Sequence, residues 1–153
     1  MSTFVTIIRR ALATDAESIA GLYHELVANP NVLVLPDRLT QVNQDPSTGL
    51  FVATQNDVVR GTALVSLCAD VMFGSQPFAV VENIIVSKDS RSMGVGMALL
   101  RHVEAFCITS QCSKIMLLSS ARRVEAHRFF EREGFTGSSK IGFVKYRRDF
   151  QGT

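Results

Sequence analysis

The sequence contains no tryptophan, only four prolines and only three cysteines among its 153 residues. An odd number of cysteines without metal-ligand spacing argues against a disulfide framework and against a metal site. We therefore expect a cytoplasmic protein without a metal. No apolar run approaches the roughly 20 residues that span a bilayer, and the first ten residues do not resemble a signal peptide, so no membrane partner is expected.

An excess of either charge is also missing, because 16 basic residues face 14 acidic ones. A net charge of +2 does not favour a nucleic-acid partner. Hydrophobic residues make up 46% of the chain, which is enough for a core. No repeat, low-complexity tract or linker divides the sequence, so we expect residues 1–153 to form one domain.

Hydrophobic periodicity predicts strands and helices that follow one another along the chain. The first helix should begin at a capping box, Thr14 to Glu17, and end at Asn29-Pro30, and a later helix should end at Gly134. A hairpin is expected around residues 55–57. Strands are predicted at 3–9, 50–54, 58–68, 77–86, 114–119 and 141–148, and the other helices at about 37–43, from the glycine turn to 110, and at 123–133.

The segment from residue 79 to residue 119 reads as strand, turn, helix and strand, which implies a parallel pair joined by a right-handed crossover. The hairpins that precede it imply antiparallel neighbours. The sequence therefore predicts a mixed sheet with helices on both faces.

A glycine turn, Arg-Ser-Met-Gly-Val-Gly at residues 91–96, joins the buried strand to the next helix. Its two glycines allow a tight backbone turn, and the positive end of the helix points at the same place. Arg91 adds a fixed positive charge. These features favour a cradle for a phosphate, best of all a pyrophosphate. A purely structural turn, capped by Ser92, is the alternative.

Two common nucleotide motifs do not fit this turn. The dinucleotide-binding pattern requires a third glycine where Leu99 stands, and an acidic residue where the next strand ends in Ser119 and Ser120. The phosphate-binding loop of many ATPases requires Gly-Lys-Ser/Thr, which does not occur in the sequence.

The pattern Arg-x-x-Gly-x-Gly after an apolar strand resembles the acetyl-CoA signature of the GNAT superfamily of N-acetyltransferases. Residues 124–135, Val-Glu-Ala-His-Arg-Phe-Phe-Glu-Arg-Glu-Gly-Phe, resemble its second signature. The resemblance covers nearly the whole chain and implies a GNAT-like α/β fold, a mixed, mostly antiparallel sheet with one splayed parallel pair. It also implies direct acetyl transfer from acetyl-CoA to a primary amine, most simply that of a small molecule.

The resemblance assigns cofactor-binding roles to two groups of residues. The turn would bind the CoA pyrophosphate, and the strand before it would pair with the pantetheine arm, with the Val86 N–H at the thioester oxygen. The second signature would lie near the thiol. The residues so implied are Ile84, Ile85, Val86, Arg91, Ser92, Met93, Gly94, Val95, Gly96, Ser119, Arg123, Ala126, Phe129 and Phe130.

Two positions depart from the family pattern. Arg123 stands where the family often has asparagine, and Phe130 stands where a tyrosine commonly protonates the leaving thiolate. Phenylalanine has no proton to give, although a thiol with a pKa near 8.5 is a fair leaving group. Water, Ser119 or Tyr146 remain as donors. Phe130 therefore also keeps open a second hypothesis, a CoA-binding regulatory module without turnover.

Glu82 is the candidate catalytic base, because an alkylamine with a pKa near 10 must lose a proton before it can attack. Its neighbours in the strand are mostly apolar, so we expect a partly desolvated carboxylate on the face of Ile84 and Val86, with Asn83 on the opposite face. Some members of the family use a glutamate on this strand. A structural ion pair with a buried arginine is the alternative.

The acceptor pocket of this superfamily is formed by the first helix and by loops, here around Tyr23 and at residues 29–47 and 70–74. A set of acidic residues could attract a cationic amine. Met72 and Phe73 line either the pocket mouth or a dimer contact, so a homodimer remains open. The acidic residues are Glu25, Asp37, Asp70 and Glu82.

Overall fold

The computed structural model describes residues 4–152 and divides after Leu117 into two compact units. The first unit holds the sheet and three α-helices, and the second holds one α-helix and the C-terminal segment. Thr3, which the sequence placed in the first strand, lies outside the described residues.

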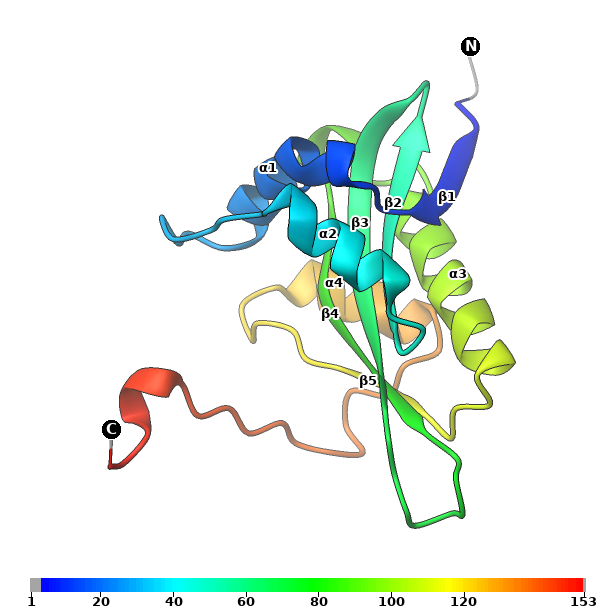
Figure 1. Cartoon of the computed structure of the whole chain (residues 1–153), viewed down its shortest axis with the longest axis vertical. Helices are drawn as coiled ribbons and strands as arrows, with labels where there is room; N and C mark the ends of the chain where they lie inside the picture. Colours follow the sequence, from blue (N-terminus) through cyan, green and yellow to red (C-terminus); the bar gives the residue numbers. More distant parts are fainter. Residues whose placement is uncertain (1–3, 153) are drawn as a thin grey trace. The chain divides into compact units, whose positions relative to one another are not determined.

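The first unit is built on a five-stranded sheet with the order β1-β2-β3-β4-β5 (Figure 1). The first four strands pair antiparallel, and β4 and β5 form the one parallel pair. The predicted mixed sheet is thereby confirmed. The strands are β1 (Thr6–Arg10), β2 (Thr48–Gln55), β3 (Val58–Cys68), β4 (Phe78–Val86) and β5 (Ile115–Leu117).

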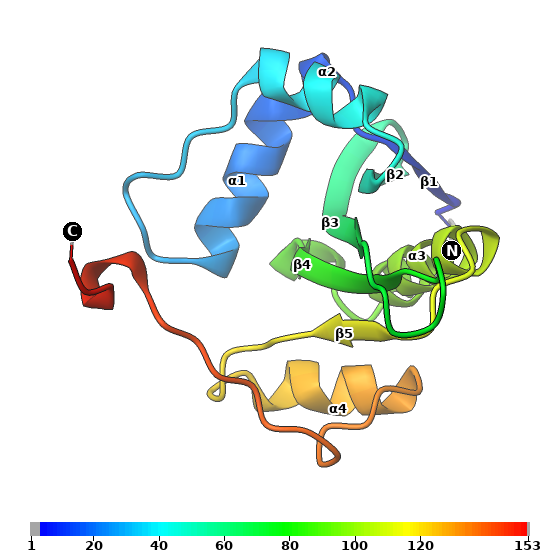
Figure 2. The same ribbon diagram turned by 60° about the horizontal axis from the view of Figure 1, so that its bottom comes forward.

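Helices cover both faces of this sheet, as Figure 2 shows for α1 (Ala16–Leu26), α2 (Pro36–Gln44) and α3 (Val95–Thr109). Neighbouring residues of β2 point to opposite faces. Leu50 and Val52 therefore pack with α1 and α2, whereas Phe51 and Ala53 pack with α3. The two resulting cores explain why residues 50–53 of β2 are all apolar, since a strand covered on both sides has no solvent-facing side there.

The β2–β3 hairpin turns at Asn56 and Asp57, as predicted. Both residues have positive φ, 50° and 61°. This two-residue geometry matches the twist of the flanking strands, and asparagine and aspartate tolerate it better than most residues do.

The first helix begins differently from the prediction. A short 3-10 helix, Ala13–Asp15, precedes α1, and Asp15 rather than Glu17 makes the capping contact, accepting the Leu12 N–H at 2.7 Å. Asp15 is buried and also binds Arg9 of β1 through two hydrogen bonds of 2.7 and 2.9 Å. Because this ion pair holds the chain that enters α1, the Thr14–Glu17 capping box does not form.

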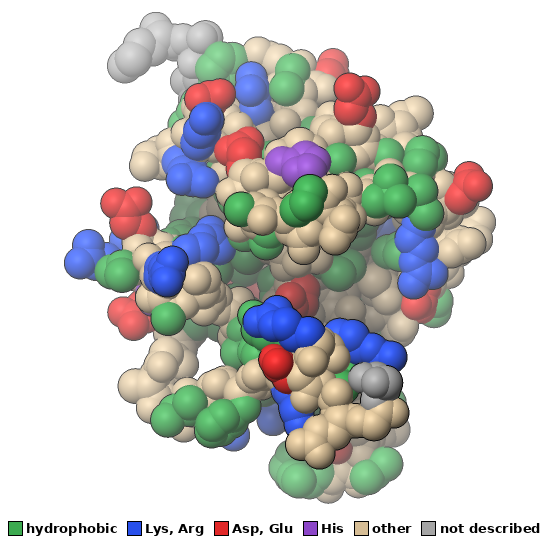
Figure 3. Space-filling model, turned by 90° about the vertical axis from the view of Figure 1, so that its left-hand side faces the viewer, with side chains coloured by type: hydrophobic (Ala, Val, Ile, Leu, Met, Phe, Trp, Pro, Cys, Tyr) green, Lys and Arg blue, Asp and Glu red, His purple; other side chains and the backbone are tan. Residues whose placement is uncertain are grey.

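The second unit contains α4 (Val124–Arg132), which ends at Gly134 as predicted. Gly134 has φ +95°, and hydrogen bonds from Gly134 and Phe135 to the last turn close the helix. The strand predicted at 141–148 is wrong, since this segment pairs with no strand among the described residues and contains only a short 3-10 helix, Arg147–Asp149. Lysine and arginine side chains gather near its C-terminal end (Figure 3). In residues 4–152, no helix is long and apolar enough to cross a membrane.

Candidate active site

A β-bulge interrupts β4 directly before the glycine turn. The pairing with β3 passes from Leu64–Glu82 to Thr62–Ile85, so β4 contributes one residue more than its partner strand. Asn83 lies in the bulge and adopts a left-handed conformation with φ +54°. Bulges of this kind commonly re-aim side chains beside functional sites.

The bulge changes which face Glu82 occupies. Ile84 and Val86 pack on the α3 side, whereas Glu82 pairs with Leu64, which packs on the α1 side. The prediction that Glu82 shares a face with Ile84 and Val86 is therefore wrong, because the extra residue shifts the alternation. Glu82 is also exposed rather than desolvated.

Asn83 does not face away from Glu82 as predicted, because its side chain interacts with Tyr23 of α1. Burial raises the pKa of the Tyr23 hydroxyl, and the Asn83 side chain opposes this shift. Tyr23 thus lies half-buried beside the bulge, on the same side of the sheet as Glu82. Asparagine at position 83 was the one signal that could have indicated the bulge, since asparagine is enriched at positive φ.

Beyond the bulge, one edge of β4 is open. β5 pairs only with Ala79–Val81, so the sheet splays before the end of β4. The Ser87 N–H donates to the carbonyl oxygen of Arg60 in β3 at 2.7 Å. Because backbone groups of successive strand residues point in opposite directions, the N–H of Val86 points away from β3, toward the open edge.

The glycine turn follows at the end of this open edge. A 3-10 helix, Lys88–Ser90, leads into Ser92 and Gly94, which have φ +63° and +79°. No side chain in the described part of the chain caps α3. Among residues 4–152, no acceptor binds the backbone N–H groups from Ser92 to Met97. These exposed donors and the helix dipole together form a site suited to an anion.

Two contacts hold the entrance to this turn. The Arg91 Nε donates to the carbonyl oxygen of Val86 at 3.4 Å, and the Glu25 carboxylate of α1 accepts the Lys88 N–H at 3.0 Å. The sequence placed Glu25 in the acceptor pocket, but the structure joins it to the turn. Its partner could not be foreseen because residues 25 and 88 are far apart in the sequence.

The residues of the second signature belong to the second unit. Phe130 is buried and contacts Phe129 and Phe135, with ring centroids 5.5 and 6.1 Å apart. Ala126 is partly buried on the same helix, and Arg123 precedes its first turn. The buried hydroxyl of Ser119 has no hydrogen-bond partner among the described residues.

The remaining acidic candidates do not gather with Glu82. Asp70 accepts the N–H groups of Val71 and Met72 within its own loop, and Asp37 lies in the first turn of α2. Met72 and Phe73 are exposed at the tip of the β3–β4 hairpin. Within residues 4–152, no cluster of three or more histidine, cysteine, aspartate or glutamate side chains could hold a metal.

The sequence model of the GNAT acetyltransferase family matches residues 19–135, which include the bulged strand and the glycine turn. The chain belongs to the GNAT acetyltransferase family. No curated protein matches the sequence. The family assignment thus rests on the profile, and the folds of solved structures agree with it.

Three of these structures illustrate the agreement. A protein of Agrobacterium tumefaciens assigned as an acetyltransferase is 26% identical, with a TM-score of 0.83 over 92% of this chain and 99% of the other. Glucosamine-6-phosphate N-acetyltransferase from Arabidopsis thaliana is 17% identical, with a TM-score of 0.80 over 94% and 99%. The aminoglycoside N-acetyltransferase AAC(6′)-Iy, solved with CoA, is 22% identical, with a TM-score of 0.79 over 95% and 97%.

Proposed function

We propose that this GNAT protein transfers the acetyl group of acetyl-CoA to a primary amine of a small molecule. The observation that carries the proposal is the row of free N–H groups at the start of α3, placed directly after the open edge of β4. A phosphate cradle beside an unpaired strand edge suits a ligand with a pyrophosphate and an extended amide-containing arm.

The turn holds the pyrophosphate through backbone donors. Ser92 and Gly94 adopt positive φ, a backbone conformation that lets successive N–H groups converge on one anion. Arg91 is exposed at the entrance and adds positive charge. The proposed binding residues here are Arg91, Ser92, Met93, Gly94, Val95 and Gly96.

The open edge of β4 holds the arm. Ile84 and Val86 offer backbone groups on this edge, and Ile85 anchors the strand in the core. Acetyl-CoA supplies an acetyl thioester that an uncharged amine can attack at its carbonyl carbon. The Val86 N–H is then the donor that stabilises the carbonyl oxygen as it gains negative charge.

Glu82 removes the proton that the amine must lose. Its carboxylate is exposed on the α1 side of the sheet, so an amine or a bridging water can reach it. Tyr23 lies on the same side and interacts with the adjacent Asn83. We therefore place the acceptor amine between α1 and the bulge of β4.

The family resemblance also implies Ser119, Arg123, Ala126, Phe129 and Phe130, which all belong to the second unit. Phe130 cannot protonate the leaving thiolate. The unpartnered hydroxyl of Ser119 supports Ser119 as the proton donor, because a buried hydroxyl without a partner is unusual. Tyr146 is the weaker candidate, since its ring is exposed and stacks under Arg148 at 4.8 Å.

A small-molecule acceptor is the favoured class. The names of two structural neighbours state that they acetylate glucosamine-6-phosphate and aminoglycosides. We further propose that residues 1–153 act as one catalytic domain in the cytoplasm.

Calorimetric titration of the purified chain with acetyl-CoA tests the cradle, with ATP as the control ligand. Thiol release with a panel of aminosugars, polyamines and peptides then tests turnover. Binding with thiol release for one amine class supports the proposal. Binding without release for any amine would favour a CoA-binding regulatory module. Absence of acetyl-CoA binding would overturn both.

A further inference from the structure

A groove lies on the opposite face of the sheet from α1, between α3 and the strands β1 and β2. Its volume is about 390 Å³, at the lower end of the range for small-molecule sites. His102 lies seven residues into α3, about 10 Å along the helix from its start at the glycine turn. None of the residues that line this groove belongs to the proposed acetyl-CoA site.

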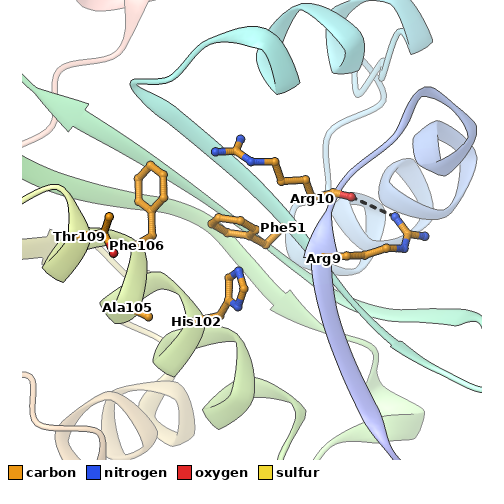
Figure 4. Close-up of a pocket in the computed structure, with 7 residues that line it drawn as sticks. All are labelled: Arg9, Arg10, Phe51, His102, Ala105, Phe106 and Thr109. Carbon is orange, nitrogen blue, oxygen red and sulfur yellow. Dashed lines mark hydrogen bonds between the residues drawn. The ribbon is translucent and has the colours of Figure 1, made fainter.

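Three rings form the apolar wall of the groove (Figure 4). The His102 ring meets Phe51 edge-on, with centroids 4.5 Å apart, and Phe106 meets Phe51 at 5.8 Å in a similar arrangement. Ala105 and Thr109 of α3 complete this wall. Phe51 is buried, whereas the Phe106 and His102 side chains are partly exposed, so these two rings offer the apolar surface to a ligand.

Arg10 supplies the charge of the groove. Its guanidinium carbon lies 5.6 Å from the centre of Phe51 and 5.9 Å from that of Phe106. It makes one hydrogen bond, to the carbonyl oxygen of Thr48 at 3.1 Å, and no carboxylate pairs with it among the described residues. Its remaining N–H donors are thus available to a ligand.

No other group in the groove offsets this charge. Arg9 points away from the rings and is neutralised by Asp15 (Figure 4). Burial and the charge of Arg10 lower the pKa of His102, which favours the uncharged form of its ring. The groove therefore carries the single positive charge of Arg10 against an aromatic wall.

We propose that this groove binds a small aromatic monocarboxylate. The carboxylate would pair with the free N–H donors of Arg10, since a guanidinium presents parallel donors that match two carboxylate oxygens. The aromatic ring of the ligand would lie against the partly exposed rings of Phe106 and His102. This inference does not depend on the proposed acetyl transfer.

Calorimetric titration with 2-naphthoate tests the site, with 2-naphthamide as a neutral ligand of the same shape. We expect saturable binding of one naphthoate per chain, unaffected by saturating acetyl-CoA, and at least tenfold weaker binding of the amide. Equal binding of the two ligands, or no saturation, would overturn the proposal.

Three variants locate the binding. Arg10→Leu removes the charge and Ala105→Met fills the groove, so each should weaken naphthoate binding at least tenfold. Arg101→Leu removes an exposed arginine next to His102 in sequence and should leave the affinity unchanged. Ala105→Met keeps every charge, so it remains informative if Arg10→Leu fails to fold. Unaltered affinity in Ala105→Met, or equal loss in Arg101→Leu, would contradict the assignment.

Discussion

The carboxylate of Glu25 accepts the backbone N–H of Lys88 at 3.0 Å, which joins the last turn of α1 to the entrance of the glycine turn. Removal of this acceptor should loosen the cradle without touching the reacting atoms. We expect Glu25→Ala to raise the KM for acetyl-CoA about threefold to tenfold with little change in kcat.

Steady-state kinetics with acetyl-CoA as the varied substrate measures this effect. Glu25→Gln should restore most of the affinity, because the amide oxygen still accepts a hydrogen bond. Glu17→Ala, at an exposed position on the same helix, is the control. An unchanged KM in Glu25→Ala would show that the turn holds its shape without this contact.

Glu82→Gln should lower kcat by a factor of about 10²–10⁴ if Glu82 takes the proton of the amine. Acetyl-CoA affinity, measured by calorimetry, should stay near that of the unaltered chain. Rates at several pH values separate this role from a structural one. Rates of Glu82→Gln equal to those of the parent across the whole pH range would remove Glu82 as the base.

Gly94 has φ +79°, and a methyl group at this position would have space, since the nearest atom lies 3.9 Å away. The cost of Gly94→Ala therefore arises from the backbone conformation, about 1–2 kcal/mol of unfolding free energy. Acetyl-CoA binding should weaken as the turn relaxes, and Gly94→Asn should be milder because asparagine tolerates positive φ.

Urea denaturation and calorimetry measure the two effects. Gly21→Ala is the matched control. Gly21 is exposed within a helix, so its replacement by alanine should raise the free energy of unfolding by about 0.5–1 kcal/mol. Full stability and affinity in Gly94→Ala would mean that the turn adopts a different conformation in solution.

The Arg9–Asp15 pair predicts a pH dependence of stability. Hydrogen bonding to Arg9 lowers the pKa of Asp15 in the folded chain. The pair therefore stabilises the fold above the unfolded pKa near 3.9, and this contribution is lost as the pH falls through the lower folded pKa. Asp15→Asn should cost about 1–3 kcal/mol at pH 7, less if solvent screens the partly exposed Arg9.

Denaturation of the parent and of Asp15→Asn from pH 7 down to pH 3 tests this direction. The difference between their free energies of unfolding should shrink below about pH 4. Asp89→Asn, at an exposed position, should follow the parent at every pH. A difference that grows on acidification would contradict the assignment.

Cys107 and Cys112 meet at the end of α3, where the Cys112 N–H binds the carbonyl oxygen of Cys107 at 3.0 Å. Burial raises the pKa of the Cys107 thiol to about 12, and the neighbouring Cys112 adds to this shift. A thiol reagent at pH 8 should therefore modify Cys68 and Cys112 before Cys107. Mass spectrometry of the labelled native protein, with the unfolded chain as control, measures the order; equal rates for Cys107 and Cys112 would contradict it.

Local signals in the sequence predicted the elements whose geometry depends on a few neighbouring residues. Asn56 and Asp57 placed the β2–β3 turn, Gly134 ended α4, and the two glycines around the start of α3 marked the candidate cradle. Each of these residues relieves a local steric constraint, so the sequence around it is sufficient.

Glu82 was assigned to the correct strand but to the wrong face. An extra residue in β4 is defined only by its pairing with β3.

The C-terminal segment illustrates the same limit. Its alternating apolar residues predicted a strand at 141–148, yet a strand exists only where a partner offers hydrogen bonds, and no described strand pairs with this segment. Likewise, Asp15 pairs with Arg9 and not with the adjacent Arg10. The sequence around these residues does not indicate which of the two arginines forms the ion pair.

The family, the order of most elements and the glycine turn could be predicted from the sequence, because these follow from short-range spacing and local backbone sterics. The open edge of β4, the face of Glu82, the partner of Glu25 and the charged groove beside α3 became visible only in the folded chain. Each of these depends on contacts between residues far apart in the chain, and such contacts form only when burial of the two cores offsets the entropy lost on folding.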